Sequence, residues 1–187
     1  MNSSSPHSQI GKILDCLTLA WWTRRDPKTN LASLNEMVSL LYLYDKKTQL
    51  SKLYPFNFRM GKGSVICRVC KVVVDALLNS NMISVVDTDI GKCMSFNNLD
   101  IVTLICQDPL NVTILDNMMS FNESLKVTEE EIRDLGVLCL LEEVFETTTL
   151  KKQQTLLSQF QNCSLETSYI QKLKTKLAIV QKGKNHD

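Results

Sequence analysis

Cys67 and Cys70 form a Cys-x-x-Cys pair, and their types and spacing suggest chemistry more directly than any other residues in this chain. Such a pair can supply half of a zinc site, because a structural zinc ion needs four ligands. It can also act as a redox dithiol, which normally lies at a helix N-terminus, where the helix dipole lowers the pKa of a thiol. The third interpretation is a pair of small apolar side chains in a packed helix.

The surrounding sequence favours the structural interpretation of this pair. No second Cys-x-x-Cys occurs, and the only histidines, His7 and His186, lie near the ends of the chain. No βαβ pattern flanks the pair, and Cys67 falls about three residues inside the helix expected here. We therefore expect two buried, inert thiols and keep the redox and metal roles as alternatives.

Other groups that could carry catalysis or bind a cofactor are scarce. Two histidines near the termini give no basis for a histidine-dependent triad or general base. The segment GKGS is shorter than the phosphate-binding loop G-x-x-x-x-G-K-[ST]. Asp87 and Asp89 share a turn with Gly91 but lack the further oxygen ligands of a calcium loop. We expect no enzymatic activity, no cofactor and no metal site.

The composition is typical of a folded, helix-rich protein. Hydrophobic residues make up 44% of the 187 residues, and only four prolines and six glycines occur. No apolar run approaches the ~18–20 residues needed to cross a bilayer, and the start of the chain does not match a signal peptide. Most of the seven cysteines lie in apolar runs, which indicates a reduced, cytoplasmic protein.

Charge is divided unevenly along the chain. The net charge is +4 over residues 1–100, −8 over 101–148 and +5 over 149–187, which gives +1 for the whole chain. This near-neutral total argues against a general nucleic-acid coat, which would be basic throughout. The acidic middle and the basic end are expected to attract each other, either within one fold or across a homodimer.

The first half of the chain shows the order of elements of a winged helix. Asp26-Pro27 should end the first helix, and Asn30 can cap the second. Val69, Val73 and Leu77 should place one face of the third helix on the first two. The expected elements are a helix over 8–25, a helix over 30–44, an extended segment over 54–58, a helix from Ser64 to about Asn79, and a hairpin over 82–96 with a turn at Gly91.

The second half reads as helical throughout. Thr128 and Glu131 fit a capping box at the start of a helix that runs to about Phe145 and has a fully apolar centre, LGVLCLL. Ser164 can cap the last helix. The other expected helices cover 99–106, 110–120 and 149–161. The predicted fold class is therefore mainly α with a small β-hairpin wing. A winged-helix-like domain (8–97) is followed by a helical extension packed on it (98–182), and residues 1–7 and 183–187 are expected to be disordered.

A basic stretch coincides with the third expected helix and the wing. It contains no acid before Asp75, and it lies where a winged helix contacts DNA, which suits it to phosphate contacts. The alternative is a set of solvated surface charges on a module that contacts only protein, because a fold does not fix its function. The candidate nucleic-acid-binding residues are Arg59, Lys62, Ser64, Arg68, Lys71 and Lys92.

The last helix carries an apolar stripe, formed by Leu165, Tyr169, Leu173 and Leu177. Lysines flank this stripe, as expected for a helix that binds an apolar groove with an acidic rim, so the four residues are candidates for partner binding. Packing onto residues 128–146 of the same chain explains the same pattern and is the interpretation we favour, because most apolar stripes belong to a core.

The segment LNEMVSLLYLYDKKTQLSKLYPFNFRMGKGSVICRVCKVVVDALLNSNMIS resembles a bacterial winged-helix pattern. In that pattern an apolar helix ending in Leu-Tyr-Leu precedes an aromatic extended piece, a loop, and a helix that leads to the wing. The resemblance covers residues 30–97. It is to domains of Panacea-type antitoxins and of the small middle components of ABC-type three-component defence systems. RMGKGS stands where the antitoxins carry Tyr-Gly-Pro, which argues against an antitoxin role.

The resemblance implies a non-enzymatic accessory protein and carries over no catalytic residue. We therefore predict a cytoplasmic winged-helix adaptor that binds a larger protein partner, such as an ATPase or effector subunit, in a bacterial defence or conflict system. A homodimer is compatible with the sequence, and no membrane contact is expected. The alternative is a DNA-binding transcriptional regulator that uses the helix and wing of residues 59–96.

Overall fold

The computed structural model describes residues 6–52, 54, 56–89, 91–145, 149–161 and 164–181. Within these ranges the chain is mainly α with small antiparallel sheets, which confirms the predicted fold class. The first helix already begins at Pro6, inside the segment expected to be disordered, whereas residues 1–5 and 182–187 lie outside the described ranges.

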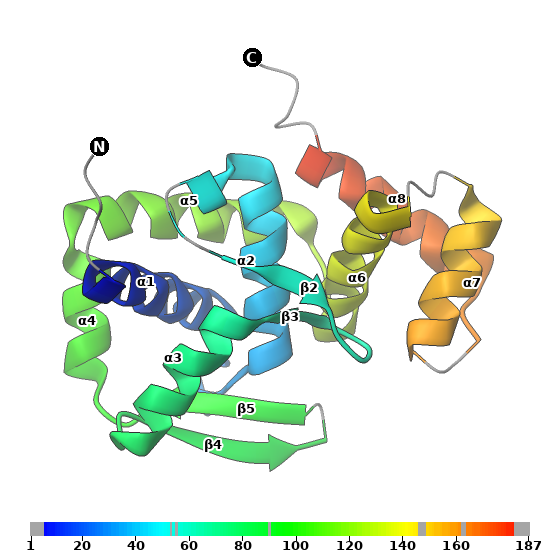
Figure 1. The fold of residues 1–187 in the computed structure, drawn as a ribbon. Coiled ribbons are helices and arrows are strands. Elements are labelled where there is room, and N and C mark those ends of the chain that lie inside the picture. Colours follow the sequence, from blue (N-terminus) through cyan, green and yellow to red (C-terminus); the bar gives the residue numbers. More distant parts are fainter. Residues whose placement is uncertain are drawn as a thin grey trace.

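The elements follow one another in the order shown in Figure 1. Those of the first half are α1 (Pro6–Arg24), β1 (Ala32–Ser33), α2 (Leu34–Thr48), the 3-10 turn η1 (Leu50–Lys52), β2 (Phe58–Met60), β3 (Val65–Cys67), α3 (Arg68–Asn79), β4 (Ile83–Thr88) and β5 (Gly91–Phe96). Those of the second half are α4 (Leu99–Gln107), α5 (Pro109–Leu125), α6 (Glu129–Phe145), α7 (Leu150–Gln161) and α8 (Thr167–Gln181).

The winged helix is formed by α1, β1, α2, α3 and the β4–β5 wing. Its antiparallel sheet has the order β1-β5-β4, so the short strand after α1 pairs with the returning strand of the wing. The wing turn is tight because Thr88 pairs with Gly91, and Gly91 adopts φ 108°, a conformation that favours glycine. α3 packs against α1 and β4, whereas β5 packs against α2 (Figure 1).

Two features of this half differ from the sequence prediction. Residues 32–33 form β1, so α2 begins at Leu34, and Asn30 does not cap it but adopts a left-handed conformation (φ 55°), which asparagine tolerates. The segment after Ser64 is a strand, so α3 begins at Arg68, four residues beyond the predicted cap. β-Branched Val65 and Ile66 prefer a strand when a partner strand is present, and β2 supplies that partner.

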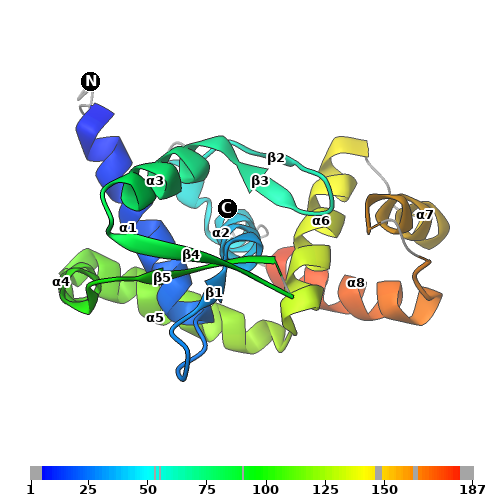
Figure 2. The same cartoon turned by 90° about the horizontal axis from the view of Figure 1, so that it is seen from below.

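The β2–β3 hairpin is an insertion between α2 and α3. Figure 2 shows it running from α3 toward α6, apart from the three-stranded sheet. Phe58 lies opposite Cys67 in this hairpin and stacks on Phe56, and its ring also contacts the edge of Tyr42 from α2. Of the described residues in the segment predicted to be extended over 54–58, only Phe58 belongs to a strand, because β2 begins at this residue.

The core of the winged helix centres on Trp21 and α2. Trp21 is fully buried, donates from Nε1 to the backbone oxygen of Met94 (3.1 Å) and meets Phe96 edge-on. Val73 and Leu77 are buried and Val69 is partly buried, as predicted, but α3 packs mainly against α1 and β4 and not against both of the first two helices.

The helical extension packs on the winged helix through α5 and α6. The predicted capping box is present: Glu131 N–H donates to Thr128 Oγ1 (3.2 Å), and Thr128 N–H donates to Glu131 Oε2 (3.1 Å). The LGVLCLL centre of α6 is buried between α2 and α8 (Figure 1). Gly136 allows this close approach, because a Cβ atom there would lie 3.2 Å from Ser39 Cβ and from Val65 Cγ2. The last helix begins at Thr167, three residues after the cap predicted at Ser164.

Candidate functional site

The predicted basic residues lie on α3, the wing and the β2–β3 hairpin. Their five cationic side chains are exposed, but Ser64 is buried, so its hydroxyl does not belong to this surface. The cations come from different elements: Arg59 from β2, Lys62 from the β2–β3 turn, Arg68 and Lys71 from α3, and Lys92 from β5.

Acidic side chains accompany these cations. Lys92 lies directly opposite Asp87 in the wing, on the same face of the β4–β5 ladder. Asp75 is exposed on α3, and Asp89 is exposed at the wing tip. The surface therefore has mixed charge and is not a continuous basic stripe.

Large apolar side chains are also exposed on the same elements. Val72 on α3 is 54% exposed and Ile66 on β3 is 47% exposed, and Ile66 lies opposite Arg59 in the hairpin. Leu78 and Val86 add exposed apolar groups on α3 and β4. Val72 is adjacent to the buried Val73 on α3, yet its side chain is exposed. We call Ile66, Val72 and Leu78, together with the exposed charges of α3 and the wing, the α3–wing surface; Val86 lies on the opposite face of the β4–β5 ladder from Asp87 and Lys92.

The apolar stripe predicted on the last helix packs against other parts of the same chain. Leu173 and Leu177 are buried, and Leu165 and Tyr169 pack partly against the same core. The hydroxyl of Tyr169 donates to Asp134 Oδ2 on α6 (2.8 Å). The structure thus follows the intramolecular alternative for this stripe, and these side chains do not form an exposed partner-binding face.

Charge attraction between the acidic middle and the basic end occurs within the fold. Lys172 on α8 forms an ion pair and hydrogen bond with Glu131 on α6. Lys176 donates to the backbone oxygen of Lys126 (3.4 Å). The pKa of Glu131 lies below its usual range, because the hydrogen bonds with Lys172 and Thr128 outweigh the effect of burial.

Cys67 occupies the N-cap position of α3 rather than a place three residues inside the helix. Both cysteines of the pair are buried, at 4% exposure for Cys67 and 1% for Cys70, and none of the six described cysteines is in a disulfide. A hydrogen bond with Cys70 lowers the pKa of Cys67 to about 6, although burial acts in the opposite direction, and the pKa of Cys70 is raised. The pair is therefore buried as predicted, yet one of its thiols ionises readily.

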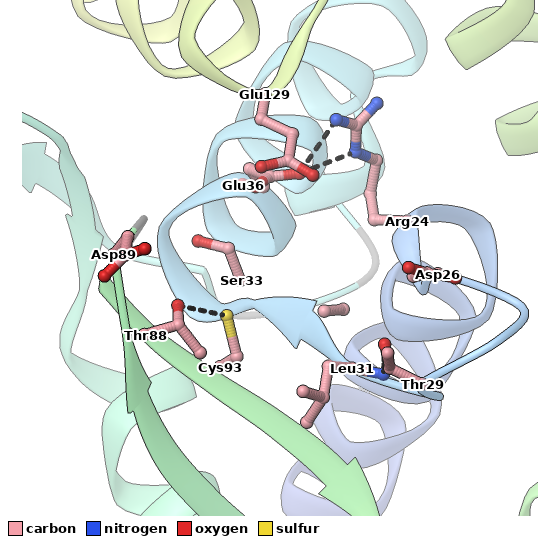
Figure 3. Close-up of a pocket in the computed structure, with 11 residues that line it drawn as sticks. Arg24, Asp26, Thr29, Leu31, Ser33, Glu36, Thr88, Asp89, Cys93 and Glu129 are labelled. Carbon is pink, nitrogen blue, oxygen red and sulfur yellow. Dashed lines mark hydrogen bonds and ion pairs between the residues drawn. The ribbon is translucent and has the colours of Figure 1, made fainter.

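A hollow lies between the wing tip and the N-terminal ends of α2 and α6 (Figure 3). We call it the wing hollow; its volume is about 280 Å³. It is lined by Arg24, Asp26, Thr29, Leu31, Ala32, Ser33, Glu36, Thr88, Asp89, Cys93 and Glu129. Sequence reasoning missed it because these residues come from three distant segments.

The buried Glu36 is the electrostatic centre of the wing hollow. Arg24 donates to its Oε2 from Nε (3.1 Å) and Nη2 (2.8 Å), and from Nη1 to Asn122 (3.1 Å). Burial raises the pKa of Glu36, and the nearby Glu129 carboxylate raises it further, while Arg24 and Arg133 lower it. Ser33 is the N-cap residue of α2, but its side chain makes no capping hydrogen bond.

The described residues contain neither a cluster suited to a metal ion nor a helix suited to crossing a membrane. No three His, Cys, Asp or Glu side chains of these residues are grouped so that they could hold a metal ion. None of the described helices combines the length and the apolar character that crossing a membrane requires.

Comparison with known proteins does not assign the chain to a family. No family model matches the chain, and no curated protein matches it significantly.

Proposed function

We propose that this protein is a non-enzymatic winged-helix adaptor that binds a larger partner protein through the α3–wing surface. The observation that supports this best is the exposure of Val72 in the middle of α3, together with Ile66 on the adjoining strand. Exposed apolar groups surrounded by charges of both signs are typical of protein interfaces, whose cores are depleted in charge and whose rims are polar.

The same surface is less suited to DNA. Interfaces with DNA are strongly positive, and an apolar side chain in the major groove finds only the methyl group of thymine as an apolar partner. Here Asp75 and Asp87 lie among the cations, and Asp87 faces Lys92 directly. A DNA-binding regulator remains the second candidate, because Arg59, Lys62, Arg68, Lys71 and Lys92 are all exposed.

The resemblance of residues 30–97 to accessory domains of bacterial defence systems suggests the kind of partner. An ATPase or effector subunit in the cytoplasm is the partner that such a role implies. We place the contact on α3 and the wing rather than on α8, because the stripe of α8 is used within the chain.

The proposal is tested by copurification from the native host with a matched pair of variants. Val72→Glu places a charge in the α3–wing surface, whereas Leu104→Glu places one at an exposed apolar position on α4 (69% exposed, against 54% for Val72). Both variants should fold, because neither side chain is buried. We expect a stoichiometric partner protein to be retained by the wild type and by Leu104→Glu, and its recovery to fall at least tenfold for Val72→Glu. Equal recovery with both variants would place the interface elsewhere.

A further inference from the structure

We propose that the wing hollow binds the guanidinium group of an arginine side chain presented by a partner protein. This site differs from the α3–wing surface, because it lies between α2, α6 and the wing tip and includes no residue of α3, although both include Asp89 at the wing tip. The inference therefore goes beyond the proposed adaptor surface and can fail independently of it.

Two side chains that line the hollow, those of Glu36 and Ser33, have an oxygen without a hydrogen-bond partner among the described residues. Glu36 is 2% exposed, and both of its hydrogen bonds from Arg24 reach Oε2, so Oε1 has no donor among the described residues. Ser33 is 3% exposed, and no described residue is hydrogen-bonded to its hydroxyl. Figure 3 shows this hydroxyl directed toward the space between α2 and the wing. Neither oxygen is completely buried, so both can accept a hydrogen bond from a ligand that enters the hollow.

The charge of the lining indicates that the donor is a cation. Four carboxylates line the hollow, those of Asp26, Glu36, Asp89 and Glu129, against the single guanidinium of Arg24. Arg24 is already engaged with Glu36 and Asn122, whereas Asp89 and Glu129 form no ion pair with any described residue. Arg133, on the next turn of α6 after Glu129, acts on Glu36 from outside the lining.

The arrangement of the acceptors favours arginine over other cations. Glu36 and Glu129 lie on one side of the hollow and Asp89 on the other (Figure 3). A guanidinium group carries five donors in a planar fork and can reach several carboxylates at once, whereas an ammonium group is a compact point charge.

The experiment uses the full chain and two small probes, N-acetyl-arginine amide and its neutral isostere N-acetyl-citrulline amide. Amide NMR signals are followed during each titration. We expect saturable shifts at Ser33, Glu36 and Thr88 with the arginine probe, in the millimolar range of a single side chain, and at least tenfold weaker binding of the citrulline probe. N-acetyl-lysine amide should bind more weakly than the arginine probe.

Variants test whether the probe binds in the hollow. Asp89 and Glu129 are exposed, so Asp89→Asn with Glu129→Gln should leave the fold intact and weaken the arginine probe at least tenfold. The control, Asp116→Asn, removes an exposed carboxylate of α5 and should change nothing. Equal binding of the citrulline probe, shifts located outside the hollow, an unchanged affinity in the double variant, or the absence of saturable shifts would each overturn the proposal.

Discussion

At the scale of single residues, the position of Cys67 at the start of α3 changes what its thiol can do. An N-cap cysteine lies at the positive end of the helix dipole, and here a second thiol, that of Cys70, stabilises the thiolate. The sequence could not reveal this, because Ser64 is a better N-cap by residue type and Val65 and Ile66 suit a helix face as well as a strand. Residues 65–67 form a strand because they pair with β2, and α3 therefore begins only after Cys67.

We predict that Cys67 titrates near pH 6 in the folded protein. Thiolate absorbance near 240 nm should rise through this pH, and the transition should be lost in Cys67→Ser. Cys16→Ser is the control, because burial raises the pKa of Cys16 to about 12. Because the pKa of Cys67 in the folded state is below the 9.0 of an unperturbed thiol, ionisation of this thiol should increase the stability of the protein as pH rises from about 6 to 9. A protein without any thiol that titrates below pH 8 would contradict the prediction.

A second residue-scale prediction concerns Asp134, which connects α6, α7 and α8. It accepts hydrogen bonds from Gln161 and Tyr169, yet burial raises its pKa from 3.8 to about 6. The folded state therefore binds this proton more tightly than the unfolded state. As pH rises from about 4 to 6 the proton is released, and the free energy of unfolding of the protein should fall by about 2–3 kcal/mol.

The variant Asp134→Asn tests this sign, because its amide does not titrate. Urea unfolding at pH 4 and pH 7 should show the variant gaining about 2 kcal/mol relative to the wild type between these conditions. The opposite sign, or the same pH dependence in both proteins, would show that burial does not dominate at Asp134.

At the scale of the elements, helices with strong local signals were predictable and the small strands were not. The capping box at Thr128 fixed the start of α6, and Asp26-Pro27 fixed the end of α1. By contrast, β1 has two residues and exists only because β5 pairs with it. Contacts of that kind depend on tertiary structure, which no local pattern encodes.

The capping box should stabilise α6 by the usual amount for an N-cap. Thr128→Ala removes the acceptor of the Glu131 N–H, so the free energy of unfolding should fall by about 1 kcal/mol. Thr113→Ala, an exposed threonine inside α5, is the control and should change it by no more than a few tenths of that value. Equal denaturation midpoints for the wild type and Thr128→Ala would show that the cap contributes nothing.

The two sides of α3 should respond oppositely to a charge. Val73 is buried against α1, so Val73→Asp buries an unpaired carboxylate, should cost several kcal/mol and should prevent soluble folding. The neighbouring Val72→Asp should remain soluble with nearly unchanged thermal melting, because Val72 is exposed. A soluble, stable Val73→Asp protein would show that this face does not pack into the core.

At the scale of the whole molecule, the helical extension and the winged helix share a continuous set of buried residues. α6 packs on α2, and Gly136 allows their close approach. The sequence predicted both halves but not the wing hollow, because Arg24, Asp89 and Glu129 come together only once α1, the wing and α6 are placed. The same limit applies to the α3–wing surface, since the rotation of α3 decides that Val72 is exposed and Val73 is buried.

Duplex DNA binding by the full chain across a salt series tests the central claim most directly. If α3 and the wing serve a protein partner, the wild type should show no submicromolar affinity at physiological salt, and Arg68→Ala with Lys71→Ala should behave like it. If these cations neutralise phosphates, affinity should fall linearly with the logarithm of salt concentration. Submicromolar affinity at physiological salt that is lost in the Arg68→Ala, Lys71→Ala variant would contradict the adaptor function and establish the regulator instead.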